Sequence, residues 1–137
     1  VWVEDWMNHP NGANGITCVT YIAHDPSDLE ARFSGIYGEA ATDLQEGYLK
    51  VQTDRGIFEV VSPDFARARF SGIDLPIDEQ ELPTGVAIRV STTSMDKAKK
   101  HLNKNGVDYV QTEEGGVRIP AHYAGNTIIE IYPEEAK

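Results

Sequence analysis

Two stretches of the chain place one carboxylate inside a short apolar run. Ile57–Ser62 reads IFEVVS and Thr127–Tyr132 reads TIIEIY. Each run is short and rich in β-branched residues, which predicts a buried strand. An ionised glutamate in such a strand is costly unless a cation pairs with it or coordinates it. Because this costly pattern occurs twice, at Glu59 and Glu130, 71 positions apart, we predict a duplicated fold with a shared central cavity.

The segments before Glu59 have the hydrophobic spacing of one strand, one helix and three further strands. Asp25 and Pro26 form a helix start, and Gly38 ends the helix. Leu29 and residues four and seven positions later form its apolar stripe. The predicted elements are a strand at Ile16–Ala23, a helix from Pro26 to about Tyr37, strands near Ala40–Leu44 and Tyr48–Thr53, and the Glu59 strand.

The same order recurs before Glu130. Ser94 is a predicted helix cap and Gly106 a helix end, with Met95, Ala98 and Leu102 on one helical face. The predicted elements are a strand at Gly85–Ser91, a helix from Met95 to Asn105, short strands near Tyr109–Thr112 and Val117–Ile119, and the Glu130 strand.

These repeats define the expected domain organisation. An arm or linker at residues 1–14 precedes one α+β domain at residues 15–137. Module one spans residues 15–62 and module two spans residues 84–134. The connector at residues 63–83 begins with a segment that can form one or two helical turns, and its later part is rich in proline and acidic residues, which is typical of a loop.

Composition narrows the possible partners. The net charge of −10 and the absence of a basic patch interleaved with aromatic residues argue against nucleic acid and against an anionic membrane. No apolar run approaches the roughly 20 residues of a membrane helix, and no signal peptide is recognisable, so we expect a cytoplasmic protein. The single cysteine, Cys18, excludes an internal disulfide and is expected to be a small buried residue.

The paired βαβββ order, with a glutamate in the last strand of each module, resembles the vicinal oxygen chelate superfamily. This group includes glyoxalase I, bleomycin-resistance proteins and extradiol dioxygenases. The resemblance covers roughly residues 15–132. It implies a half-open, curved, eight-stranded sheet or barrel with helices outside, and a divalent metal held by the first and last strands of each module.

Carried over by position, the resemblance makes Glu59 and Glu130 the metal ligands and catalytic residues. The two first-strand ligand positions fall on Thr17 and Gly85, where the superfamily usually has histidine. Neither residue is an ordinary metal ligand.

The N-terminal phrase W-x-x-HPNGA, from Trp6 to Ala13, is similar to the start of the second half of longer glyoxalase-like proteins. This resemblance implies a C-terminal unit whose partner is the N-terminal half of a longer protein. A homodimer is the other partner that the superfamily implies.

Strand alternation predicts which side chains share the cavity with the two carboxylates. It places Tyr132 beside Glu130, and it places Thr17 and Tyr21 on the inner face of the first strand. Arg89 is predicted to face the same cavity.

Arg89 cannot lose its charge, so we expect it to pair with Glu130 or Glu59. The resemblance implies a second role, since an arginine four residues after the first-strand ligand position can hold a substrate carboxylate. The two interpretations of Arg89 are a structural ion pair and an anion-binding group. His9 and His122 lie in turns that can reach the mouth of the pocket or remain on the surface.

Two functional hypotheses follow. The first is an enzyme unit of the glyoxalase, isomerase or dioxygenase kind, which acts on a small oxygenated metabolite through a divalent metal. The second is a metal-free unit that binds a small molecule or serves as a scaffold beside a catalytic half.

Overall fold

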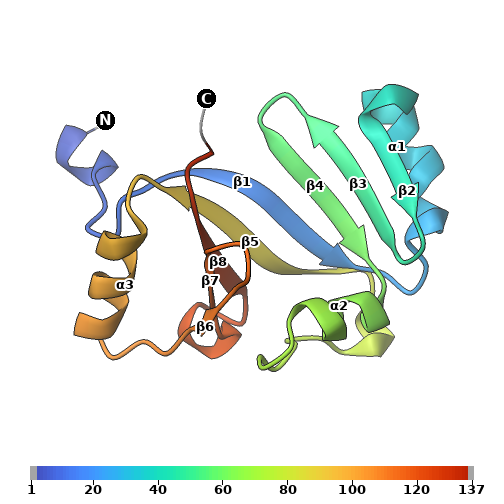
Figure 1. Cartoon of the computed structure of the whole chain (residues 1–137). Coiled ribbons are helices and arrows are strands. Elements are labelled where there is room, and N and C mark those ends of the chain that lie inside the picture. Colours follow the sequence, from blue (N-terminus) through green and yellow to red (C-terminus); the bar gives the residue numbers. More distant parts are fainter. Residues whose placement is uncertain (1–2, 136–137) are drawn as a thin grey trace.

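The computed structural model describes residues 3–135, so Val1 and Trp2 of the predicted N-terminal arm lie outside the described residues. Within this range the predicted element order is confirmed. Two βαβββ modules follow one another, and a connector containing a short helix joins them (Figure 1).

Module one contains four strands and one helix on the positions expected from the sequence. The helix is preceded by a 3-10 turn in which the side chain of Asp25 accepts a hydrogen bond from the backbone N–H of Ser27 at 3.0 Å. The elements are β1 (Ala13–Ile22), α1 (Glu30–Tyr37), β2 (Thr42–Gln45), β3 (Tyr48–Thr53) and β4 (Gly56–Val61).

Module two repeats this order with shorter strands near its outer edge. Ser94 caps its helix by accepting a hydrogen bond from the backbone N–H of Lys97 at 3.2 Å. The elements are β5 (Thr84–Thr92), α3 (Met95–Lys104), β6 (Val110–Gln111), β7 (Val117–Ile119) and β8 (Ile128–Pro133).

All eight strands form one mixed, open sheet in the order β2-β3-β4-β1-β5-β8-β7-β6. In each module the first and last strands pair in parallel, β1 with β4 and β5 with β8. The antiparallel pairing of β1 with β5 joins the modules at the centre. This topology places the two glutamate strands symmetrically on either side of the central pair.

The two faces of the sheet have different partners. On one face α1 covers module one, where Leu29 and Phe33 pack with buried Leu49 and Val60. The helix α3 covers the corresponding part of module two, as Figure 1 shows at the left. The predicted apolar stripe of α1 holds for Leu29 and Phe33, but Ile36 is 65% exposed.

The connector lies against the opposite face. Its helix α2 (Pro63–Arg69) starts at Ser62, whose side chain accepts a hydrogen bond from the backbone N–H of Phe65 at 3.2 Å. Ala66 and Phe70 are fully buried beside Val61, Ile128 and other residues of the sheet. The connector therefore fills part of the space enclosed by the curved sheet.

Part of the expected N-terminal arm belongs to the sheet, because β1 begins at Ala13 rather than at Ile16. The turn before it is fixed to β5, since the hydroxyl of Thr92 donates to the carbonyl of Asn11 at 2.9 Å. Gly12 has a φ of 74°, and an added Cβ would lie 2.7 Å from Thr92 Oγ1. Glycine is therefore required both by the backbone conformation and by this close approach.

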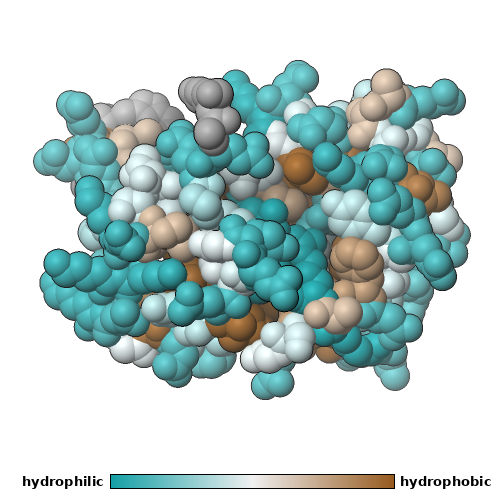
Figure 2. Space-filling view, in the orientation of Figure 1, coloured by the Kyte–Doolittle hydropathy of each residue, from teal (hydrophilic) through white to brown (hydrophobic). Residues whose placement is uncertain are grey.

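The side of the molecule drawn in Figure 2 is largely hydrophilic, and its hydrophobic side chains occur in small separate patches. Among residues 3–135 no helix combines the length and the apolar character needed to cross a membrane.

Candidate functional site: two buried glutamates beneath a cationic cavity

Glu59, on β4, is 3% exposed and its carboxylate has hydrogen-bond donors on both oxygens. Oε1 accepts from the hydroxyl of Thr20 at 2.6 Å and from the guanidinium of Arg69. Oε2 accepts from the hydroxyl of Tyr48 at 3.0 Å. Module one thus contributes two neutral donors, and the connector contributes the positive charge.

Glu130, on β8, is fully buried and is surrounded by guanidinium groups. Nε of Arg118 donates to Oε2 at 2.8 Å, and NH2 of Arg89 lies 3.3 Å from Oε1 and 3.4 Å from Oε2. The expectation that Arg89 pairs with one of the two glutamates is therefore confirmed, and the partner is Glu130.

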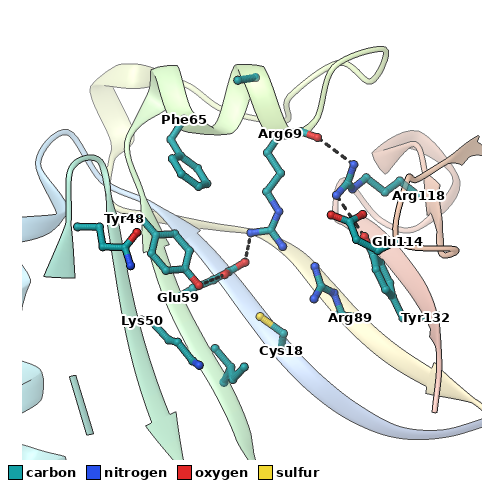
Figure 3. Close-up of a pocket in the computed structure, with 13 residues that line it drawn as sticks. Cys18, Tyr48, Lys50, Glu59, Phe65, Arg69, Arg89, Glu114, Arg118 and Tyr132 are labelled. Carbon is teal, nitrogen blue, oxygen red and sulfur yellow. Dashed lines mark hydrogen bonds and ion pairs between the residues drawn. The ribbon is translucent and has the colours of Figure 1, made fainter. Parts of the chain in front are cut away.

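Arg69 connects the two carboxylates. From the last position of α2, its NH1 pairs with Glu59 while its NH2 lies 3.6 Å from Glu130. Its backbone carbonyl accepts a hydrogen bond from NH1 of Arg118 at 2.9 Å. The neighbouring Phe70, 1% exposed, anchors this end of the helix in the core. A residue of the connector thus contacts the glutamates of both modules, and Figure 3 shows its ion pair with Glu59.

Burial alone would raise the pKa of Glu59, but the charge of Arg69 and hydrogen bonds from Thr20, Arg69 and Tyr48 outweigh it and hold this pKa below its usual range. Burial likewise opposes the charge of Arg69, but Glu59 and Glu130 raise its pKa. Both members of this ion pair are therefore charged at neutral pH.

The other titratable groups near Glu59 are held in their neutral forms. Burial, together with the negative charge of Glu59, raises the pKa of the Cys18 thiol to about 12. Burial and the same carboxylate raise the pKa of Tyr48. Cys18 is thus an unreactive thiol, in agreement with the expectation of a small buried residue.

Above the two carboxylates lies an open cavity of about 690 Å³. Figure 3 shows Tyr48 and Phe65 on one side of it, Tyr132 on the other, and the guanidinium of Arg69 between them. Three arginines and one lysine line this cavity, and its remaining walls are largely apolar or aromatic. The lining residues are Cys18, Gln45, Tyr48, Lys50, Ile57, Glu59, Phe65, Ala68, Arg69, Arg89, Glu114, Arg118 and Tyr132.

Arg89 lies at the module-two side of this cavity. Its guanidinium carbon is 4.1 Å from the centre of the Tyr132 ring. The ring is held by a hydrogen bond of 3.2 Å from Arg118 to its hydroxyl, and Gly116 makes room for it, since a Cβ there would lie 2.7 Å from the ring. Nε of Arg89 is buried, and within the described part of the chain it has no acceptor.

The inner face of β1 differs from the sequence prediction by one residue. Cys18 lines the cavity and Thr20 bonds to Glu59, whereas Thr17 is exposed and Tyr21 packs with Phe58 on the α1 side. The pairing of β1 with β5 contains three register shifts, which a comparison of sequence positions does not reveal. A one-residue slip moves every side chain of a strand to the opposite face.

Three other predicted positions also lie away from the cavity lining. Gly85 faces the ring of Tyr21, since a Cβ there would be 3.3 Å from that ring. His9 is exposed, with its ring 5.7 Å from that of His101, and His122 borders a different, smaller hollow. Of the candidate residues, the structure therefore brings together Glu59, Arg89, Glu130 and Tyr132.

Sequence reasoning missed two arginines of this site. Arg118 lies between two apolar residues of a short strand. The same pattern identified Arg89, so the argument that a buried arginine needs an anionic partner also predicts a role for Arg118. Arg69 lies in the connector, where no strand or helix periodicity predicts that its side chain points toward the carboxylates.

The residues at this site do not fit a bound divalent metal. Glu59 and Glu130 donate their oxygens to guanidinium and hydroxyl groups, and the first-strand residues beside them in the parallel ladders are Thr20 and Arg89. A metal ion would add two positive charges where three guanidiniums already exceed two carboxylates. Among the described residues, no three histidine, cysteine, aspartate or glutamate side chains form a metal-binding group.

Comparison with solved structures identifies the architecture. Methylmalonyl-CoA epimerase from Mycobacterium tuberculosis is 14% identical, with 91% of each chain covered and a TM-score of 0.62. Homoprotocatechuate 2,3-dioxygenase from Arthrobacter globiformis is 10% identical with a TM-score of 0.62. The match covers 91% of this chain but only 37% of the dioxygenase. The chain has the glyoxalase-like fold of the vicinal oxygen chelate superfamily.

The corresponding dioxygenase from Brevibacterium fuscum is 9% identical, with 94% of this chain and 40% of that chain covered and a TM-score of 0.59. The chain thus spans well under half of the dioxygenases that it resembles. No protein-family model and no curated protein matches the sequence. At these identities the likeness establishes the vicinal oxygen chelate fold, while activity is a separate question.

Proposed function

We propose that this domain binds a small organic anion in its central cavity and does so without a metal ion. The observation that carries the proposal is the surplus of positive charge in the cavity. Four cationic side chains line it, whereas three carboxylates lie among them: Glu59 and Glu130, which are buried, and Glu114, which is exposed. In a protein with a net charge of −10, such a local surplus favours anions of low molecular weight over cations.

Arg89 is the proposed anion anchor. Its contacts with Glu130 are long, at 3.3 and 3.4 Å, and its Nε has no acceptor in the described structure. The Arg89 side chain is 25% exposed and lines the cavity, so a ligand carboxylate can reach the guanidinium. Tyr132 holds the guanidinium plane in place, so Arg89 is already ordered before the ligand arrives.

The cavity walls favour an anion with an apolar or aromatic body. Tyr48 and Phe65 pack against each other with ring centres 5.2 Å apart, and Tyr132 lies on the opposite side. Such walls bind the body of a ligand while a few polar groups fix its orientation. One similar structure, the Brevibacterium fuscum dioxygenase, is a complex with 3,4-dihydroxyphenylacetate, an aromatic carboxylate. Phenylacetate is therefore a suitable first probe.

Titration calorimetry with phenylacetate and with the neutral analogue phenylacetamide tests the proposal. We expect binding of the anion only. Arg89→Leu should remain folded and lose at least about tenfold in affinity, because one charge-assisted hydrogen bond contributes about 1.5–3 kcal/mol. Lys104→Gln, which removes an exposed charge from α3, serves as the matched control and should bind like the unmodified protein. A folded protein that binds no organic anion, combined with an unstable Arg89→Leu, would show that Arg89 forms only a structural ion pair.

A further inference from the structure

Lys50 occupies a special position in the duplicated sheet. It lies directly opposite Glu59 in the pairing of β3 with β4, and Arg118 lies directly opposite Glu130 in the pairing of β7 with β8. The two cations therefore hold equivalent places beside equivalent carboxylates. Arg118 forms an ion pair with Glu130 from this position. Lys50 does not bind Glu59, because Tyr48 and Arg69 occupy that carboxylate.

The ammonium group of Lys50 thus has no partner within residues 3–135: it takes part in no hydrogen bond or ion pair there. Its side chain is half-buried and lines the cavity, and Figure 3 shows it extending from β3 toward the cavity from the side opposite Arg89. The side-chain amide of Gln45, on the neighbouring strand, lines the same end and also has no partner in the described chain. The end of the cavity formed by module one therefore contains polar donors without acceptors.

Two cations at opposite ends of one cavity have a consequence for ligand charge. The four cations and the carboxylates Glu59, Glu130 and Glu114 leave a surplus of one positive charge, and Lys50 is the cation that pairs with none of these carboxylates in the described chain. Glu114 is exposed, so solvent weakens its charge relative to those of the two buried carboxylates. A monoanion at Arg89 leaves the ammonium group of Lys50 without a partner, whereas a dianion supplies one carboxylate to each of the two cations.

The sheet also sets the separation of the two anchors. Lys50 is on β3 and Arg89 on β5, and β4 and β1 lie between them. Three strand spacings correspond to about 14 Å between backbones. Both side chains extend inward from the curved sheet, so their charged ends lie closer together than the two backbones. A short chain with a carboxylate at each end matches this arrangement.

We infer that the ligand is a dicarboxylate that spans the two modules, with one carboxylate at Arg89 and the other at Lys50. This inference rests on the proposed anion-binding function and adds the second anchor and the second charge. The side chain of Gln45 can donate an additional hydrogen bond at the Lys50 end.

The test compares dicarboxylates with monocarboxylates of the same chain length by titration calorimetry: succinate, glutarate, adipate and pimelate against butyrate, valerate, hexanoate and heptanoate. The expected result is an optimum at one chain length, at which the dicarboxylate binds at least about tenfold more tightly than its monocarboxylate. In Lys50→Met the ratio of the two affinities should fall to near one, while Lys104→Gln retains the ratio of the unmodified protein.

The outcomes are distinguishable. Equal affinities for the two series in the unmodified protein, or an unchanged ratio in Lys50→Met, would overturn the second anchor and leave anion binding at Arg89 intact. Inorganic phosphate, a compact anion, should bind more weakly than the best dicarboxylate. Tighter binding of phosphate would show that both cations converge on a single group. Failure of every anion to bind would reject the proposed function itself.

Discussion

The two modules hold equivalent glutamates by different chemistry. Glu59 of module one receives hydroxyl hydrogen bonds from Thr20 and Tyr48 and a charge from the connector. Glu130 of module two receives guanidinium groups from its own strands, through Arg89 and Arg118. The backbone positions correspond, since Thr20 and Arg89 each lie beside their glutamate in the parallel ladders.

This difference shows how a symmetric scaffold produces an asymmetric cavity. In module two the cation opposite the glutamate, Arg118, is used inside the protein. In module one the corresponding cation, Lys50, does not pair with the glutamate, because the hydroxyls of Thr20 and Tyr48 donate hydrogen bonds to Glu59. The ammonium group of Lys50 can therefore interact with a ligand. A buried carboxylate needs compensation in both cases, but the choice of donor decides which charges face a ligand.

The largest expected effect follows from breaking the module-two arrangement. Arg118→Ala removes the shortest contact to a fully buried glutamate and a hydrogen bond to the carbonyl of Arg69. We expect a loss of about 3–5 kcal/mol in the free energy of unfolding, measured by chemical denaturation. Arg67→Ala is the control, because Arg67 pairs with exposed Asp64 and should cost at most about 1 kcal/mol. Equal losses would mean that Arg118 has no special role.

A smaller effect is expected when module one loses a neutral donor. Thr20→Val retains the shape of the side chain and removes the 2.6 Å hydrogen bond to Glu59. The expected loss is about 2 kcal/mol, because the acceptor is a buried charge. Thr17→Val, at an exposed position on the same strand, should change stability by less than about 0.5 kcal/mol. A larger loss of stability in Thr17→Val than in Thr20→Val would indicate that Thr17 lies on the inner face, as the sequence predicted.

The pH dependence of stability tests the ionised state of Glu59. Its folded-state pKa is lowered, so its stabilising contribution is present above the unfolded-state pKa of about 4.3 and is lost as the pH falls through the lower folded-state pKa. In denaturation measurements from about pH 5 to pH 3, Glu59→Gln should therefore flatten the decline of stability with acid. Parallel declines in the variant and the unmodified protein would contradict a lowered pKa.

The smallest expected effect on stability belongs to Lys50. Because Lys50 has no hydrogen bond or ion pair in the described chain, Lys50→Met should change the free energy of unfolding by less than about 0.5 kcal/mol. Arg118 occupies the equivalent position in module two, so the difference in stability loss between Lys50→Met and Arg118→Ala directly compares the two modules. A loss comparable to that of Arg118→Ala would mean that Lys50 compensates Glu59 after all.

Much of the fold follows from local sequence signals. The βαβββ order, the two glutamate strands and the pairing of Arg89 with a glutamate all came from alternation, caps and the cost of buried charge. These features are predictable because each depends on a few neighbouring residues.

The remainder of the site depends on long-range geometry. The face presented by Thr17 was predicted incorrectly, because the parallel ladders place Thr20 beside Glu59 in the position that Arg89 has beside Glu130, and this correspondence depends on strand pairing. The contacts of Arg69 depend on how α2 packs against the sheet, through Ala66 and Phe70. The ammonium group of Lys50 has no partner because Thr20, Tyr48 and Arg69 bond to Glu59, and these contacts depend on the three-dimensional structure.

The central claim is that the internal carboxylates are already compensated, so the cavity accepts anions and not divalent cations. Thermal unfolding of the unmodified protein, with phenylacetate or a dicarboxylate in one series and Mn²⁺ or Zn²⁺ in the other, tests it most directly. Binding to the folded state raises the melting temperature, and at 100 times the dissociation constant the rise is roughly 8 °C. We predict such a rise with an organic anion and none with either metal. A rise with a metal and none with any anion would contradict the account.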